Sequence, residues 1–289
     1  MRRDARDYQI IFLSLFLALG IWARDWTLRP EMIGAAIAAC FFTQFFCSWA
    51  VKHSPWKINK DRPTPQEVPL FNWRSPLITA LALSLLLRTD HIATMMLAGG
   101  LAIASKFVFR TQGKHFFNPA NFGIIATLLL TQDAWVSPGQ WGEDVWYAFI
   151  FLGAGGLVLK RVGRWDTTVA FLGSYAFLEA LRNLWLGWTW DVWAHRLMSG
   201  SLLLFALFMI TDPRSIPNAR LGRLVWAVAI ALLTFILRNQ FFIPTAVFWA
   251  LFALAPITIL VDKYWPATRF RWKEPLRLAL PKASEAISG

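Results

Sequence analysis

EMIGAAIAACFFTQFFCSWAV, residues 31–51, is the stretch that decides the fold. Its only charged residue is Glu31, and a helix of about 20 such residues crosses the ~30 Å hydrocarbon core of a bilayer. Similar apolar runs recur along the chain, at about 8–23, 31–51, 75–88, 91–109, 117–131, 144–159, 167–181, 195–211, 222–238 and 241–261. The sequence therefore predicts an all-α polytopic membrane protein with about ten transmembrane helices. Residues 1–265 would form one transmembrane domain, and residues 266–289 a basic cytoplasmic tail.

The composition excludes an ordinary soluble domain. Hydrophobic residues make up 56% of the 289 residues and charged residues 16%, whereas about a quarter of the residues in soluble domains are charged. A net charge of +12 is also typical of proteins that bind nucleic acid. Here, however, the basic residues lie in short gaps between apolar runs, as they do in membrane proteins. We therefore expect contact with the lipid bilayer and no nucleic-acid partner.

The placement of lysine and arginine predicts the orientation. If the chain starts inside and crosses the membrane at each run, 23 of its 29 basic residues fall in cytoplasmic segments. Cytoplasmic loops are enriched in these residues. We therefore expect both termini in the cytoplasm.

Two of the predicted cytoplasmic loops interrupt the apolar pattern with proline. The first leads into FNPANFG at 117–123, and the second runs from TDP at 211–213 to IPNARLG at 216–222. Proline lacks a backbone N–H, and the residue before it avoids the helical region. Such backbone is tolerated at membrane depth only where it is buried in protein or lines a polar cavity. The pattern fits ordinary turns and caps or a ligand site at helix N-termini, and the pairing of the loops favours a site.

The related layout of these loops raises the question of an internal repeat. They join predicted spans four to five and eight to nine, so they would not correspond in an inverted five-plus-five repeat. The sequence leaves open whether such a repeat exists or one local motif is used twice.

Three stretches resemble the NqrB/RnfD family, which comprises membrane proteins of the sodium-pumping NADH:quinone oxidoreductase (NqrB) and of the Rnf electron-transport complex (RnfD). They are SKFVF at 105–109 with GKHFFNPA at 113–120, FMITDP at 208–213, and residues 255–262. The resemblance covers about residues 75–265. It implies a ten-helix, urea-transporter-like bundle in the bacterial cytoplasmic (inner) membrane, flavin-dependent electron transfer, and partner redox subunits.

Two departures distinguish the chain from family members that carry covalent FMN. Those members attach FMN to the threonine of a Ser-Gly-Ala-Thr or similar motif after span five, whereas residues 131–141 here read TQDAWVSPGQW. The lysine–glutamate pair of the family becomes Lys106-Phe107, which removes a carboxylate from a cation path. The sequence thus argues against covalent FMN and gives no support to sodium pumping. Short homologues of this kind also resemble UnbU-type proteins.

The function predicted from these features is that of a membrane protein within a flavin-dependent electron-transfer system, which holds riboflavin or FMN non-covalently. The predicted cofactor-binding residues are Lys106, Asn118, Asn121, Thr211 and Asp212, with no catalytic or metal-binding residue. Two alternatives stay open: a channel or transporter for a small polar solute or ion, and a structural subunit of a larger redox or photosynthetic complex. Glu179 and Arg182, near the outer end of span seven, would form a local ion pair or mark a functional charge.

Overall fold

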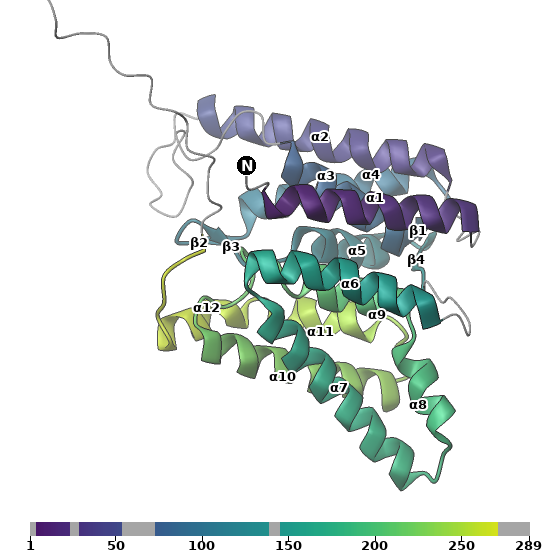
Figure 1. Cartoon of the computed structure of the whole chain (residues 1–289). Helices are drawn as coiled ribbons and strands as arrows, with labels where there is room; N and C mark the ends of the chain where they lie inside the picture. Colours follow the sequence, from purple (N-terminus) through teal and green to yellow (C-terminus); the bar gives the residue numbers. More distant parts are fainter. Residues whose placement is uncertain (1–3, 24–28, 54–72, 139–144, 271–289) are drawn as a thin grey trace, which may run out of the picture.

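The computed structural model describes residues 4–23, 29–53, 73–138 and 145–270. A helix lies at each of the ten predicted apolar runs (Figure 1). The chain is an all-α polytopic integral membrane protein, as its sequence predicts. Most of the predicted basic tail, from residue 271 onward, lies outside the described residues.

The first half of the chain supplies α1 (Ala5–Ala23), α2 (Pro30–His53), α3 (Arg74–Leu86), α4 (Ile92–Val108) and α5 (Pro119–Leu130). Two small antiparallel ribbons join them. Strand β1 (Leu87–Thr89) follows α3 and pairs with β4 (Ala134–Val136), which follows α5. Strands β2 (Arg110–Thr111) and β3 (Lys114–His115) form a hairpin between α4 and α5. The sequence did not predict the ribbons, because strands of two or three residues are too short to show an alternating pattern.

The second half supplies α6 (Val145–Val162), α7 (Trp165–Trp185), α8 (Trp190–Leu197), α9 (Gly200–Leu204), the π-helix η1 (Phe205–Met209), α10 (Arg220–Asn239), α11 (Ala246–Leu254) and α12 (Ile257–Tyr264). Two predicted spans are therefore interrupted. The run 195–211 is divided among α8, α9 and η1. The run 241–261 bends by 50° between α11 and α12, where Pro256 cannot donate the hydrogen bond that would continue the helix.

The described helices differ in length and apolar character. By length and composition, α1, α2 and α10 are long and apolar enough to cross a membrane, and the bent pair α11–α12 makes a fourth if it is one span. The apolar helices α3, α4, α5 and the joined α9–η1 are shorter, at 10–17 residues. The shorter helices need neighbours or ribbons at their ends to satisfy backbone groups within the bilayer.

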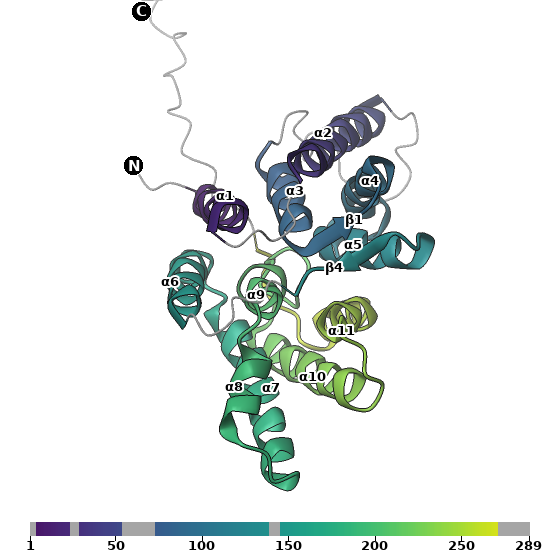
Figure 2. The same cartoon turned by 90° about the vertical axis from the view of Figure 1, so that its right-hand side faces the viewer.

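The packing order reveals an inverted repeat that the sequence left open. In the first half α2 packs on α4, α4 on α5 and α1 on α3; in the second, α7 packs on α10, α10 on α11 and α6 on α9 and η1. The two groups meet at α1 and α6, which run in opposite directions, and at α5 and α11 (Figures 1 and 2). Five elements of one half thus correspond to five of the other, turned over.

This correspondence has a trace in the sequence. Thr89-Asp90 follows α3, and Thr211-Asp212 follows η1, its counterpart in the second half. The connection into α5, which carries Asn118-Pro119, corresponds instead to the connection into α11, which carries Pro244. The two proline loops therefore share one end of the molecule without being equivalent by the repeat.

Close packing joins the helices within and between the halves. Phe16 of α1 stacks on Phe151 of α6, with ring centroids 4.1 Å apart. Gly123 brings α5 against α4: a Cβ at this position would lie 2.7 Å from the Cβ of Ala102 and 2.7 Å from the carbonyl oxygen of Ala98. Small residues at such a crossing let two backbones approach closely, as is usual between membrane helices.

Candidate functional site

The two proline loops meet at one end of the bundle, beside the β2–β3 hairpin and α12 (Figure 1). The side-chain amide of Asn118 donates a hydrogen bond to the carbonyl of Met209 over 3.2 Å. The Nε2 atom of His115 lies 3.7 Å from the carboxylate of Asp212. The structure therefore brings together two interruptions that are far apart in sequence.

The β2–β3 hairpin sets the direction of two charged or polar side chains. Its turn places Gln112 at φ +52° and Gly113 at φ +78°, and two positive φ values are typical of a type I′ turn, which matches the twist of the strands. Neighbouring residues on a strand point to opposite faces. Lys114 accordingly reaches Asp262, while His115 faces Asp212.

Lys114 and Asp262 tie α12 to both loops. Their ammonium and carboxylate groups lie 2.7 Å apart, and Lys114 also donates to the carbonyl of Ile216. Asp262 accepts from the backbone N–H of Asn218 over 2.7 Å and from its side-chain amide over 2.9 Å. Burial lowers the pKa of Lys114, although the partner carboxylate opposes this shift. The hydrogen bonds of Lys114 and Asp262 therefore hold the hairpin, the second proline loop and α12 together at this end of the bundle.

Asn118 and Thr211 use their side chains to shape the helix ends. The carbonyl oxygen of the Asn118 side chain accepts from the backbone N–H of Asn121 over 3.1 Å, which is an N-cap, and Pro119 occupies the first turn of α5. The hydroxyl of Thr211 donates to the carbonyl of Leu207 over 2.8 Å, within the π-helical segment. These two side chains position the backbone of the loops.

The side chain of Asn121 has an unsatisfied hydrogen-bond acceptor within the described residues. Its side chain is 1% exposed, and its amide donates to the carbonyl of Phe248 on α11 over 3.2 Å. Its side-chain oxygen is buried and has no donor within the described residues. A buried polar atom of this kind costs free energy unless a partner satisfies it.

Asp212 is the carboxylate of the site that faces His115. Burial raises its pKa, but interactions with His115 and the backbone N–H of Arg214 outweigh that effect and hold the pKa below its usual value of 3.8. Burial also lowers the pKa of His115 from its ordinary 6.5, more than nearby Asp212 raises it. At neutral pH the pair is therefore an ionised carboxylate facing a neutral imidazole.

Lys106 lies deeper and is held by the first half of the chain. Its ammonium donates to the side chains of Gln44 over 2.9 Å and Ser75 over 3.0 Å. Lys106 interacts electrostatically with Asp212, but it makes no hydrogen bond to the two loops within the described residues. Four of the five predicted residues, Asn118, Asn121, Thr211 and Asp212, thus lie in the two loops. Lys106 lies beside the loops and interacts with Asp212 only electrostatically.

An aromatic cluster covers the site. Phe109 lies 5.3 Å from Phe117 and 5.1 Å from Phe122, measured between ring centroids. Phe117 stacks on Phe252 of α11 at 5.0 Å. The cluster excludes water from one side of the loops and offers flat apolar surfaces beside the polar groups.

Sequence reasoning missed Lys114, His115, Asn218 and Asp262 as parts of this site. Lys114, His115 and Asp262 fall in stretches that carry the family resemblance, and Asn218 falls in the second proline loop, so a closer reading of those segments would have found them. Their pairing depends on the hairpin turn and on the bend before α12, which the apolar pattern does not reveal.

A second buried polar cluster lies between α7, α8 and α10. Glu179, 2% exposed, accepts from Arg196 over 3.1 Å and from Asn239 over 2.8 Å. Arg182 instead places its guanidinium 4.6 Å from the ring centroid of Trp188. The alternative of a local Glu179–Arg182 pair is therefore wrong: Glu179 joins three helices, because Arg196 and Asn239 reach its carboxylate from neighbouring elements.

Comparison with known proteins addresses the second half of the chain. Residues 131–271 match the model of the NQR2, RnfD, RnfE family. This segment includes Thr211, Asp212 and Asp262, whereas Lys106, Asn118 and Asn121 precede it.

Similar curated proteins are named as the D component of an ion-translocating oxidoreductase complex. The one from Stutzerimonas stutzeri is 33% identical over 127 residues, which are 44% of this chain and 36% of that protein. The one from Vibrio atlanticus (strain LGP32) is 35% identical over 136 residues, which are 46% of this chain and 38% of that protein. The one from Tolumonas auensis is 34% identical over 121 residues, which are 41% of this chain and 34% of that protein. The match thus spans little more than a third of these relatives. Through its second half, the chain is therefore similar to members of the NQR2, RnfD, RnfE family.

Proposed function

We propose that this protein is a membrane subunit of an electron-transfer complex and that it binds a flavin, riboflavin or FMN, non-covalently where the two proline loops meet. The relatives named as components of an ion-translocating oxidoreductase complex support the electron-transfer role and the partner redox subunits. The observation that carries the proposal is the junction itself, where Asn118 bonds to Met209 and His115 faces Asp212.

The residues at the junction suit the edges of a flavin. The Asp212 carboxylate and the free Asn121 side-chain oxygen are acceptors for ring N–H groups. The aromatic cluster around Phe117 supplies surfaces on which a flat ring stacks. When bound, the flavin supplies the redox chemistry, and the protein supplies its position and electrostatic surroundings.

The predicted residues divide into two roles. Asn118 and Thr211 are positioning residues, because their side-chain groups already bond to the backbone. Asp212 and Asn121 would contact the flavin, with Lys106 and Lys114 offsetting negative charge on the ring or on a phosphate. We further propose that both termini lie in the cytoplasm, from the distribution of basic residues. The similar proteins from bacteria favour the bacterial cytoplasmic membrane as the location.

An absorption spectrum of the purified protein with its native partners, before and after acid precipitation, tests the proposal. We expect a flavin spectrum whose chromophore is released by acid. The variant Asp212→Asn should lose most of the flavin, whereas Asp191→Asn, an exposed carboxylate on α8, should keep it. A colourless wild-type preparation refutes flavin binding, and a colourless protein that conducts a small polar solute in liposomes supports the transporter alternative.

A further inference from the structure

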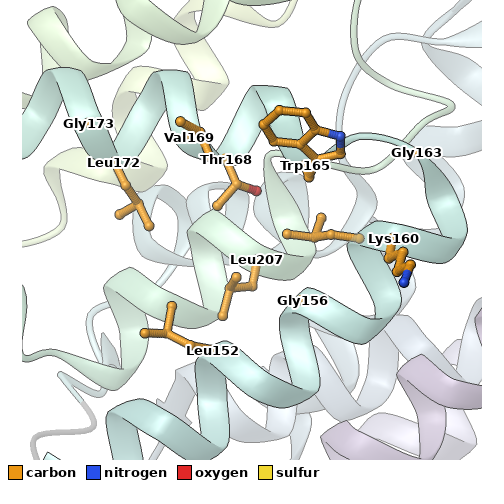
Figure 3. Close-up of a pocket in the computed structure, with 11 residues that line it drawn as sticks. Leu152, Gly156, Lys160, Gly163, Trp165, Thr168, Val169, Leu172, Gly173 and Leu207 are labelled. Atoms are coloured by element: carbon orange, nitrogen blue, oxygen red, sulfur yellow. The ribbon is translucent and has the colours of Figure 1, made fainter.

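An open groove runs along the surface between α6 and α7 (Figure 3). Its volume is about 700 Å³, and its walls are mainly apolar, with Leu207 of η1 at the floor. The hydroxyl of Thr168, which also lines it, is already bonded to the carbonyl of Ala206 over 2.7 Å. The body of the groove therefore suits a hydrocarbon and not a polar solute.

Glycines keep the groove open. Gly156 on α6 and Gly173 on α7 both line it, and a Cβ at either position would meet no atom within 4 Å. A larger side chain at Gly156 would thus enter the groove without disturbing the packed core. The groove can therefore be filled by mutation while the fold is kept.

One end of the groove is positively charged. Lys160 and Trp165 line this end. Arg161 follows Lys160 in the last turn of α6, and Arg164 precedes the first residue of α7. The nearest acid in sequence, Asp166, already accepts from Arg220 and Arg223, both over 3.2 Å. Within the described residues, no carboxylate pairs with Lys160, so this end carries an uncompensated positive charge.

The length of the groove along α6 distinguishes between possible occupants. It extends from Lys160 to Leu152 along α6, which corresponds to about 12 Å at 1.5 Å per residue. Half of a ~30 Å hydrocarbon core is about 15 Å. The length of the groove along α6 thus matches the acyl region of one leaflet. A transmembrane helix of a partner would need contact through the whole hydrocarbon core.

We propose that the α6–α7 groove binds one anionic phospholipid, with an acyl chain over Leu207 and the phosphate at Lys160. A lysine ammonium is a strong donor to a phosphate oxygen. Tryptophan prefers the headgroup level of a bilayer, which is where Trp165 stands at the charged end. Leu207 at the floor accepts a hydrogen bond from Thr211 through its carbonyl, but no residue that lines the groove is a proposed flavin contact, so the lipid site does not depend on the flavin.

Native mass spectrometry of the full chain, released from phosphatidylcholine nanodiscs containing phosphatidylglycerol, tests this proposal. We expect the wild type to retain one phosphatidylglycerol. Lys160→Gln should weaken retention about five-fold, which corresponds to the ~1 kcal/mol typical of one basic residue near anionic lipid. Gly156→Leu should abolish retention, because leucine fills the groove. The controls are Lys52→Gln, at the basic end of α2, and Gly153→Leu, whose Cβ also meets open space but lies outside the groove.

Several results would overturn the proposal. Retention of phosphatidylglycerol by Gly156→Leu at the wild-type level would show that the lipid binds elsewhere. Equal retention of phosphatidylcholine would exclude a role for Lys160 in selecting the headgroup. Release of a quinone or a polypeptide from the wild-type groove, in place of a phospholipid, would assign the groove to another ligand.

Discussion

Replacement of Gly123 by alanine should separate α4 from α5 and weaken the fold. The added Cβ would lie 2.7 Å from both the Ala102 Cβ and the Ala98 carbonyl oxygen. Neither atom can rotate away, because one is bound directly to the backbone and the other belongs to it. Overpacking of this kind costs about 1–3 kcal/mol, whereas alanine in a helix gains up to about 1 kcal/mol over glycine. We therefore expect a net loss of up to about 2 kcal/mol after the full helix gain is subtracted.

The assay is unfolding of the purified protein in mixed micelles at increasing concentration of dodecyl sulfate, followed by tryptophan fluorescence. Gly34→Ala on α2 is the matched control, because its Cβ would meet no atom within 4 Å. The double variant Gly123→Ala with Ala102→Gly removes one of the two clashes and should recover part of the loss. If Gly123→Ala proves as stable as Gly34→Ala, the inferred close contact of α4 and α5 is wrong.

Further predictions concern the charged groups. Lys114→Gln and Asp262→Asn should each cost about 1–3 kcal/mol, since each leaves a partly buried partner unsatisfied, and a double-mutant cycle should show coupling of the two residues. Because burial lowers the pKa of His115, the folded chain binds its proton less readily than the unfolded chain, so stability should fall as the pH drops below 6.5. The slope should vanish in His115→Gln but not in the exposed control His195→Gln, and unfolding measured from pH 7 to pH 5 checks this. Glu179→Ala should lower the unfolding midpoint through loss of the bonds that join three helices, and an unchanged midpoint would contradict that role.

The helices could be predicted from the sequence because apolar runs are long compared with the charged gaps between them. Residues 31–51 fall within a single helix, Pro30–His53. The run 195–211 shows where this reasoning ends. Its apolar character continues through α9 and η1, and no residue in the run signals that the hydrogen-bond pattern changes to that of a π-helix.

The candidate site was only partly predictable for a related reason. Asn-Pro and Asp-Pro reveal where the helical backbone stops, so the loops at Asn118 and Asp212 could be identified from local chemistry. The partners of those loops depend on tertiary packing. Asp262 reaches Lys114 from 148 positions away, and no local rule connects residues at that separation.

The inverted packing of the two halves has a consequence for how such a chain is inserted into a membrane. An odd number of elements per half means that the same architecture enters the bilayer in opposite directions. Positive charges, however, follow the side of the membrane and not the position within the half. Arginine and lysine must therefore occupy different positions in the two halves. These residues then do not align when one half of the sequence is compared with the other. A duplicated ancestry would then be clear in the backbone, while the sequence would keep only short traces such as Thr89-Asp90 and Thr211-Asp212.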